Sequence, residues 1–377
     1  MSTAQPPAKG RRTNPFVPVF PVGNSGSPGS ADELQRGMQI LHNSPSRRPR
    51  LHRLAKAGLI LLGWSGLALN SPAAASALAP PTERIAMMLD ADMFNEVDDQ
   101  FALAFAVRSP ERIDLKAVYA APFKNHRART AEEGMEKSYH ETVRVLKLLN
   151  HPSDGLVFRG SRSYLPDRNT PVDSPAARHL IKLSHEEREG PLYVVGLGAA
   201  SNLASALLMD PSITNRIVMV WIGGQPHGWR RAHDFNLEQD IPAAQVLFDS
   251  GVPLVHIPAN VAARLSITLP ELEKGLKGKS IIADALYQNV EEYYVETRKN
   301  RDVPRSGRGA WTKVIWDIAT IAWLLEGDAS VTSELVAAPV LNDAGEWTGA
   351  KRNHQVRVAT QLSRDRIYKG LFEKLSE

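Results

Sequence analysis

Two patterns of apolar residues alternate along positions 84–362 of the chain. Short continuous apolar runs are typical of strands buried on both faces, whereas apolar residues spaced by three or four positions are typical of helices. The continuous runs predict five strands, at residues 84–92, 113–123, 191–198, 216–224 and 252–258. The helical spacing predicts helices at residues 98–107, 131–149, 202–210 and 242–251.

This alternation predicts an α/β fold with a mainly parallel central sheet flanked by helices, because parallel strands need a crossover connection that is usually a helix. Residues 335–349 and 354–362 then predict a hairpin that turns between Asn342 and Gly345. A last helix is expected from about Arg364. No internal repeat and no break in composition follows residue 84, so residues 80–377 are expected to form a single catalytic domain.

The first 79 residues lack the alternation. Residues 1–37 are rich in Pro, Gly and Ser without an apolar period, which predicts a disordered extension. Residues 38–79 contain a basic stretch (SRRPRLHRLAK), an apolar core (AGLILLGWSGLAL) and a small-residue stretch (NSPAAASALA), in the order of an export signal peptide. The apolar core is too short to span a membrane, so we expect a periplasmic or secreted protein without a stable membrane anchor. The alternative is a disordered tail on a cytoplasmic protein.

The charge distribution argues against a nucleic-acid partner. The sequence pI is about 9.2, but residues 1–79 hold nine of the 45 Lys and Arg and only two of the 41 Asp and Glu. The remainder therefore has 36 basic against 39 acidic residues, without a basic stripe interleaved with aromatic residues. The chain has no cysteine, which excludes disulfides, thiolate nucleophiles and cysteine-based zinc sites.

Four aspartates gather around the end of the first predicted strand: Asp90, Asp92, Asp98 and Asp99. Ligands of open parallel sheets bind beyond the carboxyl ends of the strands, which makes this position a candidate site. One or two acids at a helix N-terminus are explained as caps. Four would raise each other's pKa unless a cation neutralised them, and oxygen ligands suit Ca²⁺ or Mg²⁺. The cluster predicts a metal site, with caps and solvated charge as the alternative.

The aspartate cluster also resembles the signature of the nucleoside hydrolase family. The segment LDADMFNEVDDQFAL is similar to the family's D-x-D-P-G-x-D-D, with two extra residues between Asp92 and Asp98. The segment YAAPFKN offers Asn125 after the second predicted strand. This resemblance implies a nucleoside hydrolase-like fold.

Four later segments continue the resemblance in order. GLGAASNLASAL resembles G-P-L-T-N-L-A with Ser201 in place of threonine, and WIGG resembles M-G-G. DFNLEQDIPAAQVLF resembles the E-F-N segment, with Asp234 in place of glutamate, and VIWDIATIAWLL supplies Asp317. The resemblance implies calcium-dependent hydrolysis of the N-glycosidic bond of ribonucleosides. It also implies a small-molecule nucleoside partner and a homo-oligomer, a dimer or tetramer.

The resemblance assigns roles that suit the chemistry, since an oxocarbenium-like transition state needs an activated water on one face of the sugar and help for the departing base on the other. By resemblance, Ca²⁺ would be held by the carboxylates of Asp92, Asp99 and Asp317 and the backbone carbonyl of Ser201. Asp92 would also be the general base. The ribose hydroxyls would be bound by Asp98, Asn125, Asp234 and Asn236.

The leaving-group side departs from the common family pattern. Trp316 stands where many members carry a histidine that can act as a general acid. The Trp316–Asp317 pair resembles the purine-preferring branch, where stacking on the base aids its departure, so purine nucleosides are the expected substrates. His227 and His233 are candidate replacement acids. The alternatives are that Trp316 is a core aromatic residue and that both histidines have no catalytic role.

Two other functional classes share part of the pattern. A D-x-D after an apolar strand also occurs in haloacid-dehalogenase-like phosphatases, although the Asp98–Asp99 pair and the later D-F-N segment argue against that class. A non-catalytic calcium-dependent nucleoside or sugar-binding protein would need the metal ligands. It would not need Asp92 as a water-activating carboxylate.

Overall fold

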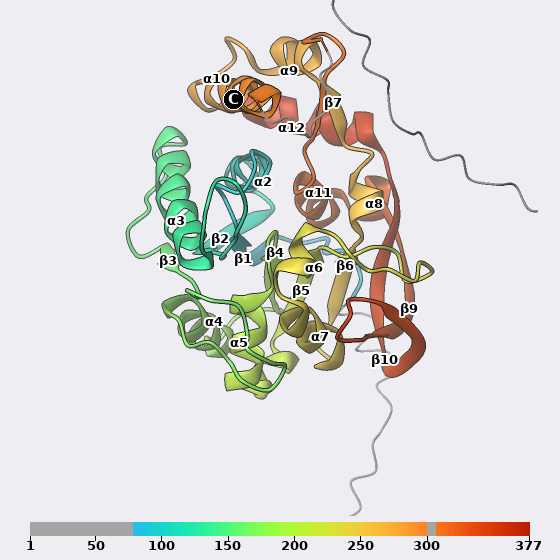
Figure 1. Ribbon diagram of the computed structural model, residues 1–377. Helices are drawn as coiled ribbons and strands as arrows, with labels where there is room; N and C mark the ends of the chain where they lie inside the picture. Colours follow the sequence, from blue (N-terminus) through green and yellow to red (C-terminus); the bar gives the residue numbers. More distant parts are fainter. Residues whose placement is uncertain (1–77, 300–306) are drawn as a thin grey trace, which may run out of the picture. The chain divides into compact units, whose positions relative to one another are not determined.

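An eight-stranded sheet forms the centre of the computed structural model, which describes residues 78–299 and 307–377. The strand order is β3-β2-β1-β4-β5-β6-β10-β9, and all neighbours are parallel except the antiparallel pair β10 and β9 (Figure 1). The strands are β1 (Ile85–Ala91), β2 (Ile113–Ala120), β3 (Val157–Arg159), β4 (Leu192–Gly196), β5 (Ile217–Ile222), β6 (Leu254–Ile257), β9 (Val331–Leu341) and β10 (Trp347–Leu362). The predicted α/β class with a mainly parallel sheet is confirmed.

Helices cover both faces of this sheet, which explains why its strands are continuously apolar (Figure 1). Met87 and Leu89 of β1 belong to one apolar cluster, and Met88 between them belongs to the other. One cluster is covered by α2 (Asp99–Val107), α3 (Ala131–Leu148), α11 (Ile318–Glu326) and α12 (Arg364–Leu375). The other is covered by α4 (Pro175–His185), α5 (Ser201–Met209) and α7 (Ile241–Asp249). The helices predicted at residues 98–107, 131–149, 202–210 and 242–251 are α2, α3, α5 and α7.

The predicted hairpin and last helix are also confirmed. β9 and β10 pair antiparallel, and Gly345 adopts a φ of 67° in the turn between them, a conformation that glycine tolerates best. β10 pairs parallel with β6, so the β9–β10 hairpin adds two strands to this edge of the sheet.

A smaller layer of structure was not predicted from the sequence. It consists of β7 (Ser266–Thr268), β8 (Thr312–Val314), α9 (Leu269–Leu276) and α10 (Ile281–Lys299), with β7 and β8 paired antiparallel. The short helices α6 (Phe235–Gln239) and α8 (Ala259–Ala262) follow β5 and β6. Strands of three residues are too short to show a period, yet α10 and the residues that follow β8 contribute side chains to the site described below.

The predicted N-terminal extension and nearly all of the signal-like segment lie outside the described residues. Leu78, where the described part begins, is buried in the apolar core, and its carbonyl accepts a hydrogen bond from Arg357. The carbonyl of Pro81 accepts one from Arg112 at 2.8 Å. Within residues 78–299 and 307–377, no helix is both long and apolar enough to span a bilayer.

Candidate active site

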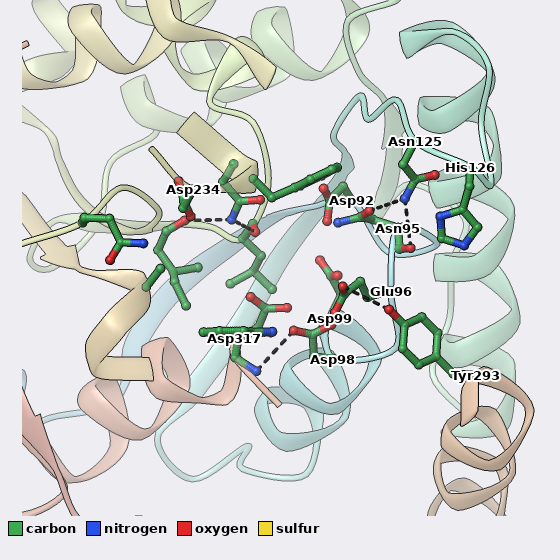
Figure 2. Close-up of a pocket in the computed structure, with 17 residues that line it drawn as sticks. Asp92, Asn95, Glu96, Asp98, Asp99, Asn125, His126, Asp234, Tyr293 and Asp317 are labelled. Carbon is green, nitrogen blue, oxygen red and sulfur yellow. Dashed lines mark hydrogen bonds between the residues drawn. The ribbon is translucent and has the colours of Figure 1, made fainter. Parts of the chain in front are cut away.

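A cavity of about 400 Å³ lies beyond the carboxyl ends of the parallel strands (Figure 2). Six carboxylates line it: Asp92, Glu96, Asp98, Asp99, Asp234 and Asp317. The predicted site residues that it brings together are Asp92, Asp98, Asp99, Asn125, Asp234, Asn236, Trp316 and Asp317. The structure therefore gathers in one place side chains that come from four separate segments of the sequence.

Two helix N-termini direct acids into this cavity. Asp98 directly precedes α2 and Asp317 directly precedes α11, but neither side chain makes a capping hydrogen bond with its own helix. Instead, one carboxylate oxygen from each of Asp98, Asp99 and Asp317 lies within 4.8 Å of the others. Capping does not explain this cluster, although the positive ends of both helix dipoles offset part of its charge.

Asp92 sits at the end of β1 against the loop that follows β4. A Cβ atom added to Gly198 would lie 3.0 Å from both Cβ and Cγ of Asp92, so only glycine allows this close approach without a shift. The Asp92 carbonyl accepts a hydrogen bond of 2.6 Å from the amide of Asn95, which turns the chain toward the cavity. The side chain of Asp92 is thereby fixed beside Asp99.

The buried acids leave oxygen atoms without partners. Asp92 Oδ2 and Asp99 Oδ1 have no hydrogen-bond partner among the described residues and are shielded from solvent. Burial, followed by the negative charges of neighbouring aspartates, raises the pKa of Asp92, Asp99 and Asp317 well above the usual range. Unpartnered carboxylate oxygens in such a group are a suitable donor set for a hard divalent cation. The acids present therefore suit a divalent cation, but the three whose oxygens lie together are Asp98, Asp99 and Asp317, and Asp92 is not part of this group.

Three further predicted residues are held rigidly at the cavity wall. Asn236 donates hydrogen bonds to the carbonyls of Leu197 (2.6 Å) and Ile222 (2.9 Å), which leaves its side-chain oxygen free of these contacts. Asp234 Oδ1 accepts from the amides of Gly224 (2.6 Å) and Leu237 (3.0 Å), the latter as the cap of α6.

Asn125 is fixed through both ends of its amide. Its Nδ2 donates to Asn95 Oδ1 at 2.7 Å, and its Oδ1 accepts from the amide of Arg127 at 2.7 Å. Polar groups oriented in this way are suited to recognise a ligand with several hydroxyl groups.

Trp316 lies between the apolar core and the cavity. Its side chain lines the cavity, and it is half-buried and packs against the apolar core. Its backbone amide donates a hydrogen bond of 3.2 Å to Asp98 Oδ2. The core contact and the cavity position are thus compatible.

Several cavity residues were not predicted from the sequence, chiefly Asn95, Glu96, His126 and Tyr293. Asn95 and Glu96 lie in the segment between Asp92 and Asp98, which is two residues longer than in the family's motif. This extra length was the feature of the sequence that could have drawn attention to them. Nothing in the sequence pattern indicated that Tyr293 of α10 would donate a hydrogen bond to Glu96 Oε1 at 3.2 Å.

The two candidate acids His227 and His233 are not among the described residues that line the cavity. The His227 ring stacks on His256 with centroids 4.9 Å apart, and burial lowers its pKa to about 4. His233 pairs with Glu238, which raises its pKa, and its second ring nitrogen contacts the Ala344 carbonyl at 2.9 Å.

Ser201 is not a cavity-lining residue either. It begins α5, and its hydroxyl donates to Asp240 Oδ2 at 2.6 Å.

Comparison with known proteins identifies the family. Residues 87–369 match the model of the inosine-uridine preferring nucleoside hydrolases. The chain belongs to this family. A nucleoside hydrolase cleaves the N-glycosidic bond of ribonucleosides, so this protein is a hydrolase acting on N-glycosyl compounds. Membership also decides against the haloacid-dehalogenase-like and non-catalytic alternatives.

Individual nucleoside hydrolases resemble this one over most of their length. The pyrimidine-specific ribonucleoside hydrolase RihA of Escherichia coli O1:K1 is 26% identical over 275 residues, which cover 66% of this chain and 82% of RihA. The plant nucleoside hydrolase PpNRh1 has a TM-score of 0.59 at 18% identity, with 78% of this chain and 99% of that one covered. A purine-preferring ribonucleoside hydrolase from Gardnerella vaginalis has a TM-score of 0.56 at 20% identity, with 77% and 98% covered. These two structures share the fold of this nucleoside hydrolase.

Proposed function

We propose that this nucleoside hydrolase is calcium-dependent and favours purine ribonucleosides, which it cleaves to ribose and free base. The observation that carries the proposal is the pair of buried, unpartnered oxygens on Asp92 and Asp99, beside Asp317 at the base of a cavity that Trp316 also lines. A hard cation relieves the repulsion among these acids, and the cavity volume of about 400 Å³ is within the range of small-molecule sites.

Asp92, Asp99 and Asp317, which line the cavity, are the proposed metal ligands. The carbonyl of Ser201 is a ligand by resemblance only, because Ser201 does not line the cavity. When bound, the ion supplies an activated water at neutral pH. Asp92 is the proposed general base, since its carboxylate is both a ligand and free to accept a proton from that water. The absence of a side chain at Gly198 leaves room for Asp92 at this position.

The proposed ribose-binding groups are Asp98, Asn125, Asp234 and Asn236. Each is oriented by the contacts described above, so little conformational freedom is lost when the sugar binds. Asp234 is shorter than the glutamate that is usual in the family, which would leave space beside the 5′ end of the sugar.

The proposed purine preference rests on Trp316. An indole does not donate a proton at a useful pKa, but it offers a large face for stacking on a two-ring base. This chain is similar both to a relative named as pyrimidine-specific and to one named as purine-preferring. Overall similarity therefore does not indicate the preferred base, and the proposal relies on the residues of the site. His227 and His233 lie outside the cavity lining, and the proposal gives them no role.

The proposal is tested by assaying released ribose from inosine, guanosine, uridine and cytidine, with and without a calcium chelator. We expect purine nucleosides to have the higher kcat/KM and the chelator to abolish turnover, which added Ca²⁺ restores. A higher kcat/KM for uridine or cytidine would contradict the base preference, and chelator-resistant turnover would contradict the metal dependence.

A further inference from the structure

One buried lysine connects the acidic loop between β1 and α2 to strand β8. Lys313 is 5% exposed, and its Nζ lies 2.6 Å from Glu96 Oε2 and 3.7 Å from Asp98 Oδ1. The same ammonium group donates to the carbonyl of Val314 at 2.5 Å. Both carboxylates that it contacts line the cavity, and Lys313 itself is not a lining residue.

The buried ammonium group of Lys313 is stable only because Glu96 and Asp98 lie beside it. A charge removed from water is costly unless nearby opposite charges and hydrogen bonds compensate it. Glu96 is fixed in turn by the hydroxyl of Tyr293, whose ring centroid lies 5.8 Å from Lys313 Nζ. The acidic loop, β8 and α10 therefore meet at one lysine, and each of them contributes a polar group.

Asp98 is the residue whose direction depends on this contact. It directly precedes α2, where an aspartate commonly turns back to cap its own helix, but it makes no such bond. Its Oδ1 accepts a hydrogen bond from the Val97 amide at 3.3 Å and lies 3.7 Å from Lys313 Nζ, and its Oδ2 accepts a hydrogen bond from the Trp316 amide. The contacts that come from outside the acidic loop are both made by residues 313–316, at the cavity wall.

The lengthened loop makes such a contact necessary. It brings Glu96 close to three buried aspartates, Asp92, Asp98 and Asp99, and an additional negative charge there would push the loop outward. Lys313 compensates this charge from behind the cavity wall, where it does not occupy space needed by a ligand.

We propose that Lys313 is a positioning residue that holds Asp98 and Glu96 at the cavity wall, and that the ribose contact of Asp98 depends on it. This role rests on the proposed function, because it assigns the ribose to Asp98.

The first test is Lys313→Met, which keeps the length of the side chain and removes its charge. KM for inosine is expected to rise and kcat/KM to fall about tenfold to a hundredfold, the effect of a binding group displaced by about 1 Å. Calcium content, measured by elemental analysis, is expected to stay unchanged. Lys313→Arg is expected to have a KM closer to that of the unsubstituted protein, because arginine retains the positive charge.

A double variant separates positioning from stability. Lys313→Met with Glu96→Gln removes both members of the closest ion pair, so the melting temperature is expected to recover while KM stays high. Recovery of both quantities would show that Lys313 only balances charge, and would overturn the inference. If Lys313→Met alone does not fold, the double variant decides.

The matched control is Lys116→Met, which removes a lysine that pairs with Asp114 on β2 at 2.5 Å, outside the cavity. It is expected to leave KM unchanged. An unchanged KM in Lys313→Met would also overturn the inference. Absence of ribose release by the unsubstituted protein would instead overturn the proposed function, and this inference with it.

Discussion

The backbone amide of Trp316 donates a hydrogen bond to Asp98 Oδ2 over 3.2 Å, although the two residues are 218 positions apart in the sequence. The residue proposed to stack on the base is therefore fixed to a residue proposed to hold the ribose. The bond joins the chain just before α11 to the start of α2, and both helices direct their N-termini at the acidic cluster (Figure 2). A substitution at either residue is expected to affect the other.

Asp99→Ala is expected to abolish calcium binding together with nearly all turnover. Asp99 is buried beside Asp92 and Asp317, and its loss removes a ligand that no solvent molecule replaces with equal charge. Metal content measured by elemental analysis checks the prediction. Asp173→Ala is the control, because Asp173 forms an exposed ion pair with Arg178. Full metal content in Asp99→Ala would contradict the assignment.

Trp316→Ala is expected to slow the hydrolysis of inosine far more than that of a nitrophenyl riboside, because a good leaving group needs little help from the protein. Stacking is worth about 1 to 3 kcal/mol, which corresponds to about tenfold to a hundredfold in rate if it acts in the transition state. Steady-state kinetics with both substrates measure the difference. Equal effects on the two substrates, or a loss of thermal stability alone, would favour a purely structural role for Trp316.

Trp316→His is expected to shift the substrate range toward pyrimidine nucleosides. A histidine would place a proton donor next to Asp317, and pyrimidines offer less area for stacking. The ratio of kcat/KM for uridine to that for inosine should rise relative to the unsubstituted protein. A ratio that falls would count against a leaving-group role for this position.

Asp234→Asn is expected to weaken substrate binding with little loss of stability. Asp234→Ala is expected to weaken substrate binding and also to lower the stability of the fold. The asparagine keeps an oxygen that can cap α6 and accept from Gly224, while alanine removes both hydrogen bonds. Loss of such a cap costs about 0.5 to 2 kcal/mol. Urea unfolding and KM for inosine distinguish the two variants. The role in ribose binding would be abandoned if KM were unchanged in Asp234→Asn.

Lowering the pH below about 6.5 is expected to destabilise the fold through His227 and His256. Burial lowers the pKa of His227 to about 4 and that of His256 well below its ordinary value. In this range these two histidines bind fewer protons in the folded protein than in the unfolded chain, so their contribution to the free energy of unfolding falls as the pH falls from about 6.5 toward 4, opposite to the contribution of the buried aspartates. Urea titrations should show a smaller loss for His227→Phe than for the unsubstituted protein. His140→Phe, at a solvent-exposed position, should not change the loss.

Export is expected to yield a mature chain that begins between about Leu78 and Thr82, since the basic, apolar and small-residue stretches follow signal-peptide order. Within this range the burial of Leu78 favours a start at Leu78, because a later cut would take an apolar side chain out of the core. N-terminal sequencing of protein recovered outside the cytoplasm checks this. Protein found only in the cytoplasm with an intact Met1 or Met38 would contradict export.

The sequence by itself determined the central sheet except β3 and, through the resemblance, eight of the residues that line the cavity. The apolar run of β1 and the spacing in α2 are local patterns, set by burial on both faces and by the helical repeat, so they can be read without the rest of the chain. Asp92 follows the first predicted strand and Asn125 the second, and the resemblance to the nucleoside hydrolases implied that both belong to the site. The structure places both in the same cavity.

Only the tertiary structure decided which way the remaining side chains point. His227 and His233 lie in a polar loop that suggested catalysis, but packing against His256 and pairing with Glu238 keep them from the cavity lining. Lys313 carries no motif, and its role depends on how β8 meets the lengthened acidic loop. Such contacts join segments that are far apart in the chain, so the local spacing of apolar residues does not predict them. They form only in the folded protein, where a charged group and its partner are buried together.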